Sequence, residues 1–154
     1  MFAHRLVAKS MTELKAPGGL ERLRVVPVHH DGTVPGIRVQ IERLLERKAD
    51  RPTALVAITT PELTTTLTHL LHRGIQIPEE MSLVSLLDDH NVPHLVPEIT
   101  RYTVSMEVLV KRLFIKLQGV WRQGNPAVRP SCVMCEFVKG KTLGPAPEQS
   151  SRTS

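Results

Sequence analysis

Four polar residues follow one apolar run directly and have side chains suited to holding a small ligand. Asp88, Asp89, His90 and His94 come after the run SLVSLL at 82–87. Carboxylates and imidazoles at the end of a buried strand can hydrogen-bond a polyol or hold a divalent metal. The same residues are also ordinary turn formers and solvated loop residues, and their spacing alone does not decide between these interpretations.

A second polar cluster and a histidine pair could also be either ligand-binding residues or ordinary surface residues. His29, His30 and Asp31 follow the apolar run 23–28, which makes them candidates for a second edge of one cleft. His69 and His72 lie one helical turn apart beside a leucine face, and we expect them to be a surface pair.

The only two cysteines, Cys132 and Cys135, have the CxxC spacing found in zinc and redox sites. They fall within the predicted strand 131–138, where residues three apart point to opposite faces and cannot share a metal. No second pair supplies the remaining ligands, so we expect a buried structural pair and no metal site.

Signatures of nucleotide binding, ester hydrolysis and metalloproteolysis are all missing from the sequence: it has no GxGxxG, GxxxxGK[ST], GxSxG or HExxH. An enzyme that uses Asp88, Asp89 and His94 on a small polar substrate is an alternative without a catalytic motif behind it. We therefore predict a protein that is not an enzyme, with no catalytic residues and no cofactor.

The charge balance raises the question of nucleic acid, since the formal net charge is +5 and the sequence pI about 9.6. The basic residues are interleaved with glutamates and apolar residues, and aromatics make up only 3% of the chain, so no stacking platform is evident. We predict no specific DNA binding by this chain alone. The absence of a long apolar run or a secretory leader, together with the scarce cysteines, predicts a cytoplasmic protein with no membrane contact.

Hydrophobic periodicity alternates between strand and helix along the chain. Strands are expected at 23–28, 53–58, 82–87, 99–104 and 131–138, and helices at 33–45, 61–73 and 105–124. This order predicts an α/β fold with a parallel, doubly wound sheet covered on both faces. Residues 1–143 are expected to form the domain, and residues 144–154, rich in Pro and Ser, a disordered tail.

One long stretch resembles a known family. The segment RPTALVAITTPELTTTLTHLLHRGIQIPEEMSLVSLLDD, at 51–89, is similar in order and spacing to the effector-binding domain of LacI/GalR transcriptional regulators. The run RGIQIPEEMSLVS is its most specific part. The later segments HLVPEITRYTVSMEVLVKRLFIKL and PSCVMCEFVKGKTLGPAP extend the resemblance, which covers about residues 5–147.

The resemblance implies a periplasmic-binding-protein-like fold, of which this chain supplies the C-terminal subdomain and one wall of the effector cleft. Matching the family's contact positions to this sequence gives Asp88, Asp89, Thr59 and Thr60 as effector-binding residues. The chain also departs from the family: Thr59 and Thr60 stand where the family has Asn-Asp, and Leu87 stands at its effector-contacting aspartate.

The resemblance also implies a function. Family members carry a DNA-binding headpiece that these residues do not resemble, so we expect a truncated ligand-sensing and dimerisation part of such a regulator. A small-molecule effector, commonly a sugar in this family, would act on a full-length parent. The alternative is a stand-alone dimerising interaction protein that has lost effector binding.

A homodimer is the expected partner arrangement. In the family this subdomain supplies much of the dimer interface, through segments that correspond here to 61–73 and 90–97. The apolar residues expected at the interface are Leu63, Leu67, Leu70, Val92 and Leu95.

Overall fold

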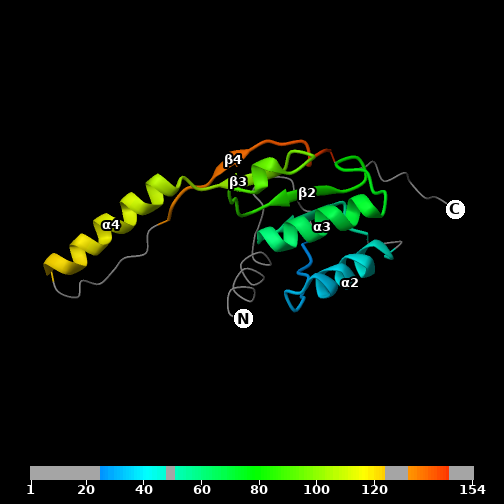
Figure 1. The fold of residues 1–154 in the computed structure, drawn as a ribbon, viewed down its shortest axis with the longest axis horizontal. Coiled ribbons are helices and arrows are strands. Elements are labelled where there is room, and N and C mark those ends of the chain that lie inside the picture. The colour runs from blue at the N-terminus through cyan, green and yellow to red at the C-terminus, as the bar shows by residue number, and fades with distance from the viewer. Residues whose placement is uncertain (1–24, 48–50, 124–131, 146–154) are drawn as a thin grey trace.

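The chain forms a mixed α/β domain, described by a computed structural model for residues 25–47, 51–123 and 132–145. Its elements are α2 (Val34–Leu45), β1 (Ala54–Ala57), α3 (Thr60–His72), β2 (Ser82–Ser85), the 3-10 helix η1 (Val92–His94), β3 (Thr100–Thr103), α4 (Met106–Gln123) and β4 (Glu136–Val138). The strands form one sheet in the order β1-β2-β3-β4 (Figure 1). The expected α/β class with a mostly parallel sheet is confirmed.

The helices begin and end where local chemistry directs them. Thr33 caps α2 by accepting a hydrogen bond from the Gly36 N–H, 3.1 Å away. Glu62 caps α3 from inside, because its carboxylate accepts the N–H groups of Ile58 and Thr59, both at 3.0 Å. Gly74 adopts the left-handed backbone, with φ of 70°, that commonly follows a helix end.

Helix α3 lies at the centre of the core, between the sheet and α2 (Figure 1). Toward the sheet, Leu63 and Leu67 join one buried cluster; the other members are Ala57, Leu83, Val92 and Ile99. Toward α2, Leu70 joins a second buried cluster with Ile37, Ile41 and Met81. Leu55 and Ile77 pack against both clusters, so the core is continuous through α3.

The segment that follows β4 packs against the sheet and hydrogen-bonds to it. Thr142 is fully buried, and its hydroxyl donates to the Leu83 carbonyl at 2.6 Å and accepts the Thr100 N–H at 2.9 Å. Its carbonyl accepts the Leu83 N–H at 2.8 Å. The backbone passes so close to β3 at Gly140 that a Cβ there would lie 2.4 Å from the Glu98 carbonyl oxygen.

Two predicted strands differ from the structure. Residues 25–28 of the expected strand 23–28 are exposed and outside any strand, while 23 and 24 lie outside the described residues. Pro27 has no N–H to give to a ladder, and no described strand pairs with this segment. Strand β4 is shorter than predicted and antiparallel to β3, pairing Tyr102 with Phe137.

The predicted positions of the two cysteines within the last strand are also wrong. Cys132 and Cys135 are exposed and precede β4, so they are not a buried pair inside a strand. The predicted tail is described only at Gly144 and Pro145, and residues 146–154 lie outside the described residues.

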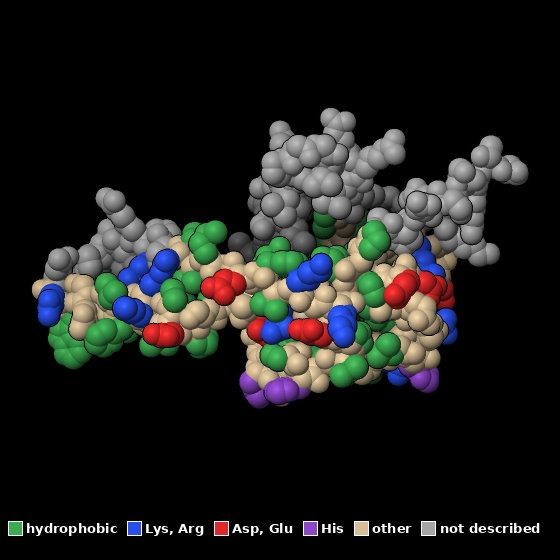
Figure 2. Space-filling model, turned by 90° about the horizontal axis from the view of Figure 1, so that it is seen from above, with side chains coloured by type: hydrophobic (Ala, Val, Ile, Leu, Met, Phe, Trp, Pro, Cys, Tyr) green, Lys and Arg blue, Asp and Glu red, His purple; other side chains and the backbone are tan. Residues whose placement is uncertain are grey.

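Helix α4 leaves the body of the domain after β3 and projects away from the sheet (Figure 1). The predicted fold required this helix to cover the second face of the sheet. It does not do so. Its apolar stripe is exposed (Figure 2). Among the described residues, no helix is both long and apolar enough to cross a membrane.

Candidate functional site

The loops that follow β1 and β2 meet at one edge of the sheet. The two strands are parallel and in register from Ala54 opposite Ser82 to Ala57 opposite Ser85, so their carboxyl ends coincide. This places Thr59 and Thr60 beside Asp88 and Asp89. The edge is the position where open parallel sheets hold ligands.

A direct hydrogen bond joins the two loops. The Thr60 hydroxyl donates to Asp89 Oδ2 at 2.5 Å, and the Asn91 N–H donates to Asp89 Oδ1 at 2.7 Å. The Thr60 hydroxyl, followed by the Asn91 N–H, lowers the pKa of Asp89 below its usual value. Asp89 is therefore a carboxylate that two hydrogen bonds hold in place at this edge of the sheet.

Asp88 points instead toward β3. Its Oδ2 lies 3.0 Å from Arg101 Nε, and both side chains are largely buried, with 15% and 12% of their surface exposed. The contact is an ion pair without hydrogen-bond geometry, because Arg101 Nε makes no hydrogen bond to any described residue. Asp88 Oδ1 is likewise buried without a hydrogen-bond partner among these residues, which leaves it an unused acceptor.

The segment before α2 reaches the same edge through a histidine. His30 Nδ1 accepts the Gly32 N–H at 3.0 Å, so Nε2 carries the proton of the neutral ring and lies 3.2 Å from Glu62 Oε1. Next to it, Asp31 accepts from the hydroxyl and N–H of Thr33, which lower the pKa of Asp31. The predicted second edge is thus brought to the start of α3.

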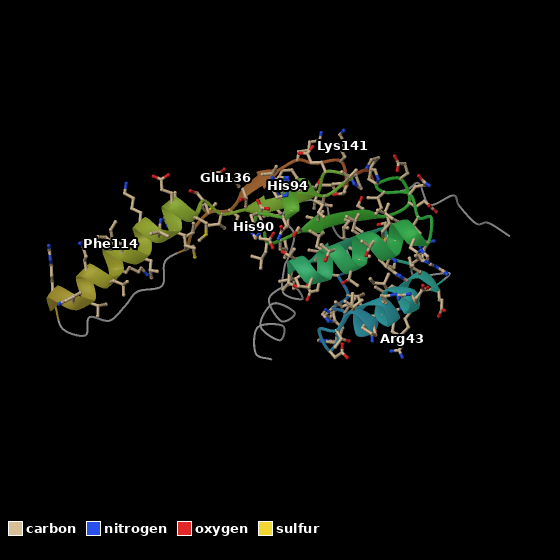
Figure 3. The ribbon with its side chains drawn as sticks, in the orientation of Figure 1. Arg43, His90, His94, Phe114, Glu136 and Lys141 are labelled. Carbon is tan, nitrogen blue, oxygen red and sulfur yellow. The ribbon has the colours of Figure 1, made fainter. Side chains whose placement is uncertain are left out.

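The burial of the remaining histidines differs in part from the prediction. His90 and His94 are exposed and lie near the end of the sheet from which α4 departs (Figure 3). His69 is buried and bound to Glu42 Oε1 at 2.8 Å, while His72 is exposed, so they are not a surface pair. In the described part of the chain, no three His, Cys, Asp or Glu residues come together as a metal site.

The residues predicted for a dimer interface lie mostly in the protein's own core. Leu63, Leu67, Leu70 and Val92 are at most 3% exposed, so they have no surface to offer a second chain. Their assignment to an interface is corrected, since the helical spacing reflects packing against the sheet and α2. Leu95 is half-buried and packs against the same core.

Two surface depressions lie away from the two aspartates. The first lies beside α2; its lining includes His29, His30, Asp31, Thr33 and Gln40. The second is near the end of α3, beside Arg51, Arg73 and Glu80.

Sequence reasoning missed Arg101 and Glu62. The signal for Glu62 is its position three residues after Thr59, the spacing of a capping box. Arg101 stands out only as a charged residue within the short strand TRYT.

Comparisons with known proteins agree with this geometry. The sequence matches the family model described as periplasmic binding protein-like domain over residues 8–143. A LacI family transcriptional regulator from Bifidobacterium animalis is 22% identical with a TM-score of 0.68; the match covers 80% of this chain and 45% of that one. The Escherichia coli transcriptional repressor ascG is 23% identical with a TM-score of 0.56, and the match covers 72% of this chain and 40% of that one.

A third similar structure is a sugar-binding transcriptional regulator of the LacI family from Escherichia coli, 18% identical with a TM-score of 0.58. That match covers 94% of this chain and 60% of the other, so the chain spans less than two thirds of each of these three structures. No curated protein matches the sequence significantly.

Proposed function

Because the chain belongs to the periplasmic binding protein-like domain family, we propose that it is the ligand-sensing part of a cytoplasmic transcriptional regulator of the LacI type. In this proposal it carries one wall of an effector site and performs no catalysis. The observation that supports it is the meeting of the loops after β1 and β2, joined by the Thr60–Asp89 hydrogen bond.

The wall has the chemistry of polyol recognition. Asp89 is held as a carboxylate and Thr59 adds a hydroxyl, while the largely buried Asp88 is turned toward Arg101. Carboxylates in such positions accept hydrogen bonds from sugar hydroxyls, and a neutral polyol needs no charged partner. The regulators it resembles include one described as sugar-binding, which supports a sugar as the effector class.

Amide NMR titration tests this, because it detects the weak, millimolar binding expected of a single wall. Pentoses and hexoses should shift the amides of Thr59, Thr60 and Asp89 in a saturable way, and Asp89→Ala should remove that response. The matched control is Glu79→Ala, which removes one exposed carboxylate in the turn before β2, at the other end of the sheet. Saturable shifts elsewhere, or none with any polyol, would refute the assignment of this edge.

A second candidate function is a stand-alone dimerising interaction protein that has lost effector binding. Two observations favour it. Leu87, at the position where the family has an effector-contacting aspartate, is exposed and apolar, and Arg101 neutralises Asp88. Such a chain would bind its own copy and give no saturable response to polyols.

A further inference from the structure

Helix α4 has an exposed apolar face that joins neither core cluster of the described residues. At about 100° per residue, eight large apolar side chains fall within an arc of about 140°. Figure 2 shows hydrophobic side chains gathered along this part of the molecule. A contiguous apolar surface of this kind marks an interaction site. The eight residues are Met106, Leu109, Val110, Leu113, Phe114, Leu117, Val120 and Trp121.

The other side of α4 is basic. Glu107 is the helix's only acidic residue, whereas four residues are basic, so α4 has a net formal charge of +3. At the same 100° per residue, all four basic residues fall outside the apolar arc. A partner of this helix must therefore offer an apolar surface bordered by negative charge. The basic residues are Lys111, Arg112, Lys116 and Arg122.

We propose that α4 binds the surface of an anionic lipid bilayer and lies in the plane of the interface. The apolar face enters the boundary between headgroups and acyl chains, while the basic side remains level with the negatively charged headgroups. Lysine and arginine suit this arrangement, because their long apolar stems let the charged ends reach water and phosphate. The proposal rests on α4 and is independent of the effector site.

This mode of binding differs from a membrane span. No described helix is long and apolar enough to cross a bilayer, and the expected absence of membrane contact rested on the missing apolar run. A helix that lies on the surface needs no such run, because one side of it stays polar. The 18 residues of α4 span about 27 Å, and the helix projects clear of the sheet (Figure 1). It can therefore lie flat on a surface without obstruction by β1 to β3.

The aromatic residues of α4 favour a bilayer over an acidic protein. Trp121, the only tryptophan of the chain, is 91% exposed, and Phe114 is 59% exposed on the same face. Tryptophan concentrates at bilayer surfaces, because its ring is apolar and its indole N–H can donate to water or phosphate. Phe114 lies on α4 well away from the sheet (Figure 3). A fluid bilayer accommodates this irregular mixture of apolar side chains, whereas a protein groove must match its shape.

Binding of the 154-residue chain to lipid vesicles tests the proposal, with Trp121 as the built-in probe. Phosphatidylcholine vesicles with about 30% phosphatidylserine should sediment the chain and shift the Trp121 emission to the blue. Binding to pure phosphatidylcholine vesicles should be at least ~10-fold weaker, and raising the salt from about 0.1 M to about 0.5 M should remove most of this difference.

Two pairs of substitutions separate the two sides of α4. Leu113→Gln with Leu117→Gln, on the apolar face, should lower the vesicle partition coefficient about 30-fold. The matched control, Val108→Gln with Ile115→Gln, changes exposed apolar residues on the opposite side and should stay within about threefold of the wild type. Both pairs leave the net charge unchanged, so the comparison isolates apolar burial.

A third pair tests the charge. Lys111→Gln with Arg122→Gln should weaken binding to the anionic vesicles about 20-fold and leave binding to phosphatidylcholine unchanged. Unchanged far-UV circular dichroism in buffer shows that each variant is folded.

Four results would overturn the proposal. They are no sedimentation with anionic vesicles, equal losses in the apolar-face and control variants, sedimentation without a shift of Trp121, and self-association that buries Trp121 and abolishes vesicle binding. An equal shift of Trp121 with soluble polyglutamate would also overturn it, in favour of an acidic protein partner. The polyol titration reports separately on Asp89, so its failure would leave the vesicle result intact.

Discussion

Replacing Thr142 by valine removes one hydroxyl from the interior and keeps the size of the side chain. In the wild type this hydroxyl bridges two strands, donating to the Leu83 carbonyl and accepting the Thr100 N–H. The residue is fully buried, so water cannot replace either bond. The substitution therefore leaves a buried donor without a partner.

The magnitude follows from these two bonds. Each contributes about 1 kcal/mol net, and a buried N–H left unsatisfied costs a further ~1–3 kcal/mol, so the total loss is about 3–5 kcal/mol. Domains of this kind have unfolding free energies of about 5–15 kcal/mol, which makes the loss a substantial fraction. With an m-value of about 1.5 kcal/mol/M, the urea midpoint should fall by about 2–3 M.

Equilibrium unfolding in urea measures this, with Thr142→Ser as the matched control. Serine keeps the hydroxyl and loses one methyl group, so it should cost about 1 kcal/mol. A valine variant within 0.5 kcal/mol of the wild type would refute the bridging role. So would a serine variant as unstable as the valine variant.

Two further predictions concern the candidate site and the C-terminal segment. Because the folded pKa of Asp89 is lowered, its contribution to stability is present above the unfolded value near 3.9 and is lost as pH falls through the folded pKa. Thermal midpoints of the wild type and Asp89→Asn should therefore differ at pH 6 and converge below about pH 4; a constant difference would contradict this. Gly140→Ala should lower the free energy of unfolding by about 1–3 kcal/mol, because its Cβ would meet backbone atoms of Glu98 and Thr100 at 2.4 and 2.6 Å. Gly119→Ala, with nothing within 4 Å, should instead stabilise α4 by up to ~1 kcal/mol, and equal effects at both glycines would contradict the close approach.

Local signals predicted the elements well. The predicted helices 33–45 and 61–73 agree with α2 and α3 to within one residue, because hydrophobic periodicity and the glycine at 74 are properties of neighbouring residues. The order of strands and helices likewise predicted the parallel pairing of β1, β2 and β3.

Partners distant in the sequence could not be predicted in the same way. An apolar stripe shows that a face is covered but does not identify what covers it, so the leucines of α3 were assigned to a second chain although they pack on the protein's own core. The burial of His69 depends on Glu42, 27 residues away, and Asp88 forms an ion pair with Arg101 of β3. No spacing rule connects such pairs.

The chain departs to α4 from Thr103 and comes back at Glu136, and these two residues are paired across β3 and β4. The excursion between them, on the order of 30 residues, therefore begins and ends at one point, and the entropy of closing it changes by only about 0.6 kcal/mol for each doubling of its length. Insertions or deletions between Thr103 and Glu136 would leave the register of the sheet and the hydrogen bonds of Thr142 unchanged. Evolution can thus alter the length and surface of this arm almost independently of the domain that carries it.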